Sequence, residues 1–492
     1  MACWILGISA LYHDSAAVLL RDGEVFAAAQ EERFTRIKHD SSLPIRAVRW
    51  LLDEAGITAQ DLDHLVFYEK PLRKFERILS TSVAWFPASW RLFPLQMRAW
   101  LGDKIWLRDK LASEFGVAPD RLLFSEHHLS HAASAFYASP HASAAVLTID
   151  GVGEWATTAL WRAEGGRVEP VSEIRYPHSL GLFYSAVTAH LGFVVNNGEY
   201  KVMGMASYGR PRFIEQMRKL VTVKDGGFEL DLTYFCHHLH PQRATTPAFE
   251  ALLGPPRHPS EPFELDSDDP AIQAASQRWA DLAASAQLLL EEVLRELVAH
   301  AHQQVPEAAL CLAGGVALNA VANQKLAEDS PFEHIWVQPA AGDAGGALGA
   351  ALWAWHMVLG NPRIPKPAFP VALGKAWPRS KVVEYLDDVI AFSQSDYTTK
   401  QPARIREVRR LAKQLNERIA RVQEEDARQP PLPKGFGNLV IAKTGRRGGP
   451  WLGKIQRWLE AEVDAGHIEG GLTADDYYTF VLQAAPEMLT DG

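Results

Sequence analysis

The chain opens with Trp4-Ile5-Leu6-Gly7-Ile8-Ser9, a polar turn at His13-Asp14-Ser15, and a second apolar run, Ala16-Ala17-Val18-Leu19-Leu20. Short aliphatic runs bounded by turn residues predict buried strands. Asp22-Gly23 is a frequent hairpin turn, and it separates the second run from Glu24-Val25-Phe26-Ala27-Ala28-Ala29. The sequence therefore predicts that the chain begins with a strand followed by a hairpin.

The same layout occurs a second time in the chain. An apolar run at 145–149 ends in Asp150-Gly151, and a second strand-like run at 153–161 leads to a turn at Gly165-Gly166. A strand, a small polar turn and a hairpin are how the actin/sugar-kinase/heat-shock-ATPase fold begins. We therefore predict an α/β protein of this two-lobed class, in which both turns face one nucleotide. The alternative is a chance alternation of strands and helices.

Two histidines and two aspartates predict a metal site. His127 and His131 are four residues apart, so a helix would place both imidazoles on one face. Asp150 follows the strand-like run just described, and Asp343 follows another at 335–338. Two imidazoles and two strand-end carboxylates suit a divalent metal such as iron or zinc. The alternative is a partly buried polar pair of histidines.

Glycine pairs mark two turns near these residues. A long amphipathic helix at 271–304 leads into a strand at 309–313, which ends in Gly314-Gly315. Gly345-Gly346 repeats the arrangement after the next strand. Glycine permits a ligand to approach the backbone, and a helix N-terminus offers free N–H groups. These turns predict a phosphate-bearing ligand, with tight packing as the alternative.

Composition excludes several classes of protein. The 492 residues are 47% hydrophobic, enough for at least two packed units. The three cysteines, Cys3, Cys236 and Cys311, show no CxxC spacing, so we expect neither disulfides nor a thiolate metal site, and a cytoplasmic location. His13 and Asp14 interrupt any signal-peptide core, and no apolar run approaches the ~20 residues of a membrane span. Without such a run we expect no membrane partner, and with a net charge of -9 we expect no nucleic acid.

Several motifs together resemble a known family. They fall in order between residues 13 and 346 and are similar to the N-terminal, ATPase-like half of the NodU/CmcH-type O-carbamoyltransferases, relatives of the tRNA threonylcarbamoyl transferase. The matching segments are His13-Asp14-Ser15-Ala16-Ala17, Glu31-Glu32-Arg33-Phe34 with Lys38-His39-Asp40, His127-His128-Leu129-Ser130-His131-Ala132, Asp150-Gly151-Val152-Gly153-Glu154, Gly198-Glu199-Tyr200-Lys201-Val202-Met203-Gly204, Ala313-Gly314-Gly315-Val316-Ala317-Leu318-Asn319 and Gly342-Asp343-Ala344-Gly345-Gly346.

The resemblance implies a reaction and its ligands. The enzyme would use ATP and carbamoyl phosphate, and would transfer the carbamoyl group of carbamoyl-adenylate to a hydroxyl or amine of a small, natural-product-like acceptor, as in antibiotic biosynthesis. Fe(2+) or a similar divalent metal would steady the leaving AMP as a Lewis acid. The implied metal ligands are His127, His131, Asp150 and Asp343. The residues implied to line the adenosine and phosphate cleft are Gly151, Gly153, Glu154, Gly314, Gly315 and Asn319.

Four further residues are candidates for the chemistry. His13 lies on the first turn, where it could act as the base toward the acceptor hydroxyl, or merely hydrogen-bond within a tight loop. Lys201 is a second catalytic candidate, and Lys38 and Glu199 are candidates for substrate binding. The two lysines could compensate phosphate charge or meet a polar acceptor. Solvated surface lysines are the ordinary alternative.

The sequence departs from the family after the first domain, which we place at 1–375. Residues 376–492 lack the signature GRMEFGPRALG of the YrdC-like domain that activates carbamoyl phosphate. Apolar residues at heptad spacing predict a helix at about 403–425, suited to docking on the body, a second copy or a protein partner. A proline-rich linker at 430–433 follows. The basic, glycine-rich segment 443–449 could bind phosphate, although an exposed loop is the simpler interpretation.

Three functional hypotheses remain open. The first is a carbamoyltransferase whose carbamoyl phosphate is activated by a partner, by a divergent C-terminal region or before the adenylate reaches the enzyme. The second is another adenylate-dependent transferase on the same fold. The third is a non-catalytic subunit that binds metal and nucleotide and recruits a partner. The intact motifs favour the first two, and the acceptor is a matter of pocket shape.

Overall fold

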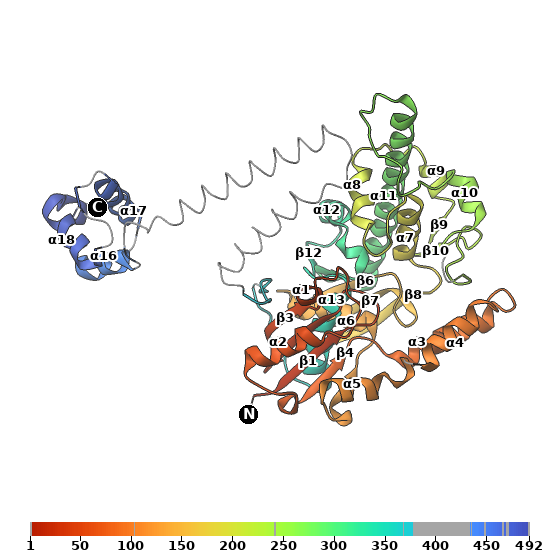
Figure 1. The fold of residues 1–492 in the computed structure, drawn as a ribbon, viewed down its shortest axis with the longest axis horizontal. Helices are drawn as coiled ribbons and strands as arrows, with labels where there is room; N and C mark the ends of the chain where they lie inside the picture. The colour runs from red at the N-terminus through yellow and green to blue at the C-terminus, as the bar shows by residue number, and fades with distance from the viewer. Residues whose placement is uncertain are drawn as a thin grey trace. The chain divides into compact units, whose positions relative to one another are not determined.

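The computed structural model describes residues 2–102, 104–240, 243–367, 369–376, 433, 435–446, 449–464, 467–468 and 472–490. The chain divides into two compact units, Met1–Lys375 and Ala376–Gly492. Figure 1 draws the first unit in red through cyan and the second in blue. The candidate functional residues all belong to the first unit.

The larger unit contains two five-stranded sheets with the same topology. The first has the order β3-β2-β1-β4-β5, and the second, read from its other edge, has the order β8-β7-β6-β11-β12. In each sheet the first strand pairs antiparallel with the second and parallel with the fourth. This duplication is the topology of the actin/sugar-kinase/heat-shock-ATPase class, so the predicted fold is confirmed. The strands of the two sheets are β1 (Trp4–Ser9), β2 (Ala16–Arg21), β3 (Glu24–Gln30), β4 (His64–Phe67), β5 (Leu122–Phe124), β6 (Ser143–Ile149), β7 (Ala156–Glu164), β8 (Arg167–Arg175), β11 (Ala309–Ala313) and β12 (His334–Val337).

Local sequence explains the first hairpin. Asp22 and Gly23 connect β2 to β3 with φ angles of 52° and 80°. A two-residue hairpin turn whose twist matches the strands needs positive φ at both positions, which aspartate and glycine adopt more readily than most residues. The turn therefore fixes the pairing of Arg21 with Glu24, and a register shift after the next pair places Ala27 opposite Leu19, where both side chains enter the core.

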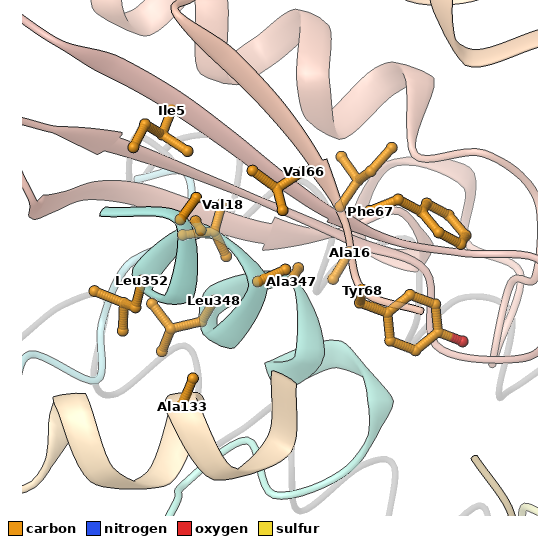
Figure 2. Packing of buried hydrophobic residues seen from close by; sticks show 14 of the residues in the cluster. Ile5, Ala16, Val18, Val66, Phe67, Tyr68, Ala133, Ala347, Leu348 and Leu352 are labelled. Carbon is orange, nitrogen blue, oxygen red and sulfur yellow. The ribbon is translucent and has the colours of Figure 1, made fainter. Parts of the chain in front are cut away.

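Helices α6 and α13 lie between the two sheets. Figure 2 shows Leu348 and Leu352 of α13 beside Val18 of the first sheet, with Ala133 of α6 below them. The helices of this unit are α1 (Glu32–Thr35), α2 (Ile45–Ala55), α3 (Pro71–Ala84), α4 (Leu92–Gly102), α5 (Leu107–Phe115), α6 (His127–Ala138), α7 (Leu180–His190), α8 (Glu199–Ala206), α9 (Ile214–Met217), α10 (Pro247–Leu253), α11 (Pro270–Gln304), α12 (Ala320–Asp329) and α13 (Asp343–Trp353), and a small hairpin pairs β9 (Val221–Lys224) with β10 (Gly227–Leu230).

Strand β6 contributes to two hydrophobic cores. Ala144 and Val146 belong to the core that contains α6, α13 and the first sheet. Ala145 and Leu147 point to the opposite face and belong to the core around α7, α8 and α11. Successive side chains of a strand face opposite sides, so a strand buried on both faces reads as a continuous apolar run. This explains why the strand was recognisable in the sequence.

Glycine permits α13 to pack closely against its neighbours. A Cβ atom at Gly7 of β1 would lie 2.0 Å from the carbonyl oxygen of Ala347. A Cβ at Gly349 of α13 would lie 1.7 Å from the carbonyl oxygen of Ser130 in α6. Both distances are far below van der Waals contact, so the backbones touch where the glycines lie. The position of α13, and of the aspartate at its first residue, depends on these contacts.

Replacing Gly349 with alanine is expected to lower the free energy of unfolding by about 3 kcal/mol or more, because the backbone of Ser130 cannot move without separating the helices. Gly204→Ala is the matched control. Gly204 also lies in a helix, but a Cβ there meets nothing within 4 Å, so a change of at most about 1 kcal/mol is expected. Urea unfolding followed by circular dichroism measures both. Equal stability of the two variants would contradict the packing argument.

The smaller unit is helical in its described residues. Its helices α16 (Phe436–Thr444), α17 (Pro450–Asp464), α18 (Ala474–Ala484) and α19 (Glu487–Thr490) enclose a core that includes Val440, Leu459 and Val481. Arg446 of the basic segment donates to the carbonyl oxygen of Leu489, so this arginine is used within the unit. The predicted helix at 403–425 and all of the predicted linker except Pro433 lie outside the described residues.

Candidate active site

Three elements bring the four predicted metal ligands together. His127 and His131 occupy the first turns of α6, and Asp150 follows the last residue of β6. Asp343 is the first residue of α13. The sequence suggested a strand end for Asp343, but β12 already ends at Val337. A helix N-terminus carries a partial positive charge, so it stabilises a carboxylate at this position.

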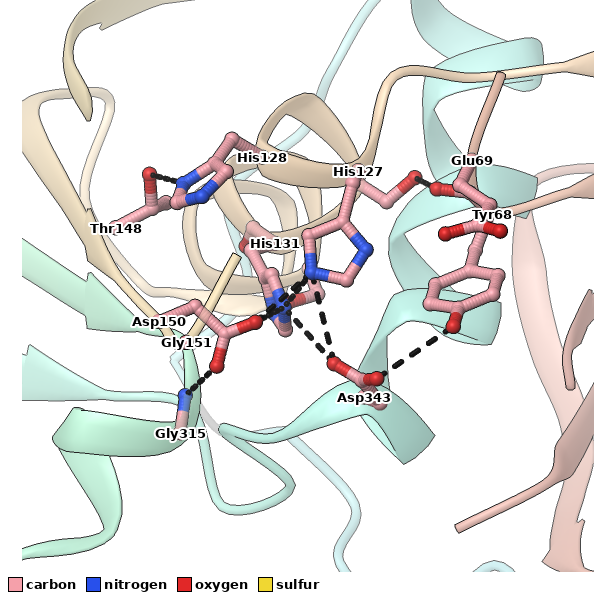
Figure 3. A network of polar contacts seen from close by, with 12 residues as sticks. Tyr68, Glu69, His127, His128, His131, Thr148, Asp150, Gly151, Gly315 and Asp343 are labelled. Carbon is pink, nitrogen blue, oxygen red and sulfur yellow. Dashed lines mark hydrogen bonds and ion pairs between the residues drawn. The ribbon is translucent and has the colours of Figure 1, made fainter. Parts of the chain in front are cut away.

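The ligand atoms of the four residues converge on one point (Figure 3). His127 Nε2 lies 3.2 Å from His131 Nε2 and 2.9 Å from Asp150 Oδ2. His131 Nε2 lies 3.4 Å from Asp343 Oδ1, and one ligand atom from each residue falls within a 4.8 Å cluster. Four ligands arranged tetrahedrally at ordinary metal–ligand distances lie about 3.3 Å from one another. The separations therefore fit a single bound metal ion.

Burial favours a positive charge at this point. Asp343 is 1% exposed, and its Oδ1 atom accepts no hydrogen bond within the part of the chain that the structure describes. A buried carboxylate is unstable unless it is paired or coordinates a metal. Burial would raise the pKa of Asp150, but hydrogen bonds to His127 and His131 hold it well below its ordinary value. The four side chains thus suit a divalent cation in both charge and donor type.

His13 faces this cluster from the first turn of the chain. Its Nε2 lies 3.8 Å from Asp343 Oδ2, and its Nδ1 lies 2.8 Å from Asp14 Oδ2. Burial alone would lower the pKa of His13, but the hydrogen bond with Asp14 and the negative charges of Asp343, Asp14 and Asp150 raise it to about 9. The ring is thus oriented by one carboxylate and directed at another.

A hydrogen-bond chain extends from His13 to the second lobe. Asp14 Oδ1 bonds His39 Nδ1 at 2.8 Å, and His39 Nε2 bonds Asn197 Oδ1 at 2.9 Å. Asp14 and His39 have φ angles of 52° and 54°, which are uncommon for residues other than glycine. Strained backbone of this kind collects at functional sites. These hydrogen bonds therefore couple the orientation of His13 to the loop that contains Asn197.

The residues predicted for the nucleotide cleft divide into two groups. Gly151 and Gly315 are accessible, and the Gly315 N–H donates to Asp150 Oδ1 at 2.9 Å. The others are buried and have structural contacts. A Cβ at Gly314, whose φ is 95°, would lie 2.2 Å from the Ile149 carbonyl oxygen, so packing accounts for this glycine. The remaining contacts are those of Gly153, whose Cβ would lie 2.8 Å from the His128 ring, of Glu154, which accepts from the His127 and Lys70 backbones, and of Asn319, which caps α12.

The three remaining predicted residues lie near Asn197 or on the surface. Lys38 is exposed, with its Nζ 3.9 Å from a Glu32 oxygen. Lys201 is exposed on α8, with its Nζ 5.9 Å from the centre of the Tyr200 ring. Glu199 accepts from the Asn196 N–H and from a neighbouring serine, so it shapes the loop that presents Asn197.

Sequence reasoning missed two buried residues beside the cluster. Tyr68 directs its hydroxyl at Asp343 Oδ2, 3.5 Å away, and its ring lies 5.3 Å from that of His127. Arg77 of α3 is buried, donates to the Gly153 carbonyl oxygen and stacks on a tyrosine ring. Tyr68 directly follows β4, a short and mostly buried strand, and this place at a strand end is the signal that could have identified it.

Residues 4–352 match the family model described as "Carbamoyltransferase N-terminus". The chain belongs to the carbamoyltransferase family. The match spans both sheets, the four clustered ligands and His13. The resemblance inferred from the motifs is therefore confirmed.

Proteins similar to this chain come from several bacteria. The chain is 46% identical to the uncharacterized protein sll1178 of Synechocystis, over 80% of this chain and 64% of that protein. It is 37% identical to nodulation protein NolNO of Sinorhizobium fredii, over 69% of this chain and 46% of that protein. It is 32% identical to nodulation protein NolO of Bradyrhizobium diazoefficiens, over 55% and 47% of the two chains. The chain thus spans about half to two thirds of the length of these relatives.

Proposed function

We propose that this carbamoyltransferase-family chain transfers a carbamoyl group from carbamoyl-adenylate to a hydroxyl or amine of a small-molecule acceptor. The proposal is carried by one observation. A histidine that is oriented by a carboxylate, His13, faces a buried cluster of two histidines and two aspartates that fits a divalent metal. A base beside a metal site that binds anions is an arrangement suited to acyl transfer from an acyl-phosphate anhydride such as carbamoyl-adenylate.

His13 and Asp14 can support the bond changes of carbamoyl transfer. The acceptor oxygen attacks the carbamoyl carbon, and its proton passes to His13 Nε2. A new carbon–oxygen bond forms, the bond between the carbamoyl carbon and the phosphate oxygen breaks, and AMP leaves with its electron pair. Asp14 occupies Nδ1 of His13 through its hydrogen bond, so Nε2 is the nitrogen left to accept the proton when the ring is neutral. Burial lowers the pKa of His13 and the carboxylates of Asp14, Asp343 and Asp150 raise it to about 9, so a divalent ion held by Asp343 and Asp150 would offset their charge and favour the neutral ring.

The metal and nucleotide would bind at adjacent positions. His127, His131, Asp150 and Asp343 would hold Fe(2+) or a similar ion, which supplies Lewis-acid stabilisation of phosphate oxygens. The nucleotide would lie against the accessible backbone of Gly151 and Gly315, on either side of the Asp150 side chain. Lys38, Lys201 and Glu199 are proposed to meet the acceptor or its phosphate donor from the rim.

Replacing Gly151 with valine is expected to weaken AMP binding at least tenfold. A Cβ at Gly151 meets nothing within 4 Å and its φ is not positive, so the side chain fills open space without straining the fold. Isothermal titration calorimetry of AMP or ATP measures the change. Gly204→Val is the matched control, because this glycine is also unobstructed but lies on α8. Unchanged affinity in Gly151→Val would place the nucleotide elsewhere.

A reconstituted assay tests the proposed function. The full chain is incubated with ATP, radiolabelled carbamoyl phosphate and a panel of sugar and amino-sugar acceptors, with and without an added carbamoyl-adenylate synthase. The expected result is AMP release that matches the amount of carbamoylated acceptor found by mass spectrometry. Binding of metal and AMP with no transfer under either condition would instead favour a binding subunit over an enzyme.

A further inference from the structure

Helices α3 and α4 carry large apolar side chains that the described residues of the larger unit leave exposed. Figure 1 shows this helical hairpin, in orange, extending away from the two sheets. Around its turn, Val83 is 73% exposed, Phe86 72% and Trp90 59%. Phe93 and Leu95 at the start of α4 are exposed as well. We call these five residues the apolar tip. Burying such a patch is favourable by about 25 cal/mol per Å², so it indicates a contact surface.

The hairpin is built to display these residues. Ser89 Oγ donates to the Ser82 carbonyl oxygen at 2.5 Å, which closes the turn between the helices. Leu92 is buried beneath it. At the base of the turn, the Trp85 ring packs 4.5 Å from the ring of His238. The apolar tip therefore lies on an element held in place by these contacts, and its exposure is a property of the folded larger unit as far as the structure describes it.

The charge of this hairpin is opposite to that of the chain. Residues 77–102 contain three arginines and no aspartate or glutamate, while the whole chain has a net charge of -9. Arg91 and Arg98 are exposed, and the Arg91 guanidinium lies 5.5 Å from the centre of the Trp90 ring. Exposed tryptophan and phenylalanine next to arginine match the layered chemistry of a bilayer surface, with acyl chains below anionic headgroups.

We propose that the apolar tip inserts into the surface of a membrane that carries anionic lipids. The sequence predicted no membrane partner because no run is long enough to span a bilayer, but a surface contact needs no span. No helix among the described residues is long and apolar enough to cross a membrane. Helix α4 has 11 residues and so a length of about 16 Å, roughly half of the hydrocarbon core. It can bury its apolar side chains in one leaflet.

Vesicle binding by the full chain tests this proposal. The chain is sedimented with phosphatidylcholine vesicles that contain or lack phosphatidylglycerol, and tryptophan fluorescence is recorded in parallel. The expected result is binding to the anionic vesicles with a blue shift, and at least tenfold weaker binding to neutral vesicles or in high salt. The variant Phe86→Ser, Trp90→Ser, Phe93→Ser is expected to lose at least tenfold in affinity while keeping its circular dichroism spectrum.

Matched variants separate the membrane from other occupants of the tip. Tyr200→Ser with Tyr208→Ser removes two exposed aromatic side chains elsewhere and should bind vesicles as the wild type does. The proposal would be overturned if the wild-type protein did not bind anionic vesicles, or if the triple variant bound them as well as the wild type does. So would light scattering that shows a dimer in the wild type and a monomer in the triple variant without vesicle binding, because a second copy would then cover the tip.

Discussion

Replacing His127 and His131 together with alanine is expected to abolish metal binding and, with it, carbamoyl transfer. The double substitution removes both nitrogen ligands and leaves two carboxylates, the half-buried Asp150 and the buried Asp343, which cannot hold a transition metal tightly alone. We expect one divalent ion per wild-type chain, none in the variant, and a loss of transfer rate of roughly a thousandfold or more, since the ion would carry the charge of the leaving phosphate.

Elemental analysis of purified protein, after iron is supplied anaerobically, measures the metal. His128→Asn is the matched control. His128 is buried on the same helix, but its Nδ1 bonds the Thr148 hydroxyl, and burial with the neighbouring histidines lowers its pKa to about 3. This variant should keep its metal. Unchanged metal content in the double variant, or none in the folded wild type, would refute the assignment.

Replacing His13 with glutamine is expected to lower kcat for carbamoyl transfer about a hundredfold or more, with a much smaller change in KM for the acceptor. Glutamine preserves the length and hydrogen bonding of the side chain but cannot accept the proton of the acceptor hydroxyl. Metal content and AMP affinity should remain at wild-type values, which distinguishes a lost base from a collapsed site. An activity close to that of the wild type would assign His13 a structural role.

Asp14→Asn and His39→Gln extend this test to the hydrogen-bond chain. His39 bonds both Asp14 and Asn197. Loss of His39 should release the Asp14 carboxylate, which orients His13, and so free the ring of His13 to rotate. A residue that positions the base lowers kcat less than the base itself, by about tenfold in this case, and alters the pH profile of kcat. Steady-state measurements of kcat between pH 6 and pH 9 compare the two variants with His13→Gln. Wild-type pH profiles in both variants would show that these hydrogen bonds have no part in positioning the base.

The fold was predictable because the same pattern of strand, turn and hairpin occurs twice in the sequence. Both first strands of the duplicated halves, β1 and β6, are buried apolar runs, and a tight turn at Asp22-Gly23 ends the pairing between β2 and β3. The grouping of His127 with His131 was also predictable, since four residues complete about one helical turn. These are local signals, and a local pattern is all that one sequence records directly.

Other features depend on contacts between distant residues. Nothing near Asn319 indicates that its side chain caps α12 and bonds Gln287, 32 residues earlier. The glycine motif at Gly314 predicts a ligand, and it gave no sign that the carbonyl of Ile149, on another strand, also requires that glycine. The approach of His39 to Asn197 joins residues 158 positions apart. Such pairs arise from the packing of whole sheets, which spacing along the chain does not encode.

Strand β6 belongs to both hydrophobic cores of the larger unit, so neither lobe is an independent structure. Removing Leu147 from its core would also loosen the strand that carries Val146 into the other. Heat should therefore melt the two lobes in one cooperative transition, as a single thermodynamic unit. For the same reason, a lobe expressed alone would present one uncovered face of β6 and would be prone to aggregate. Selection on either lobe then acts on the stability of both.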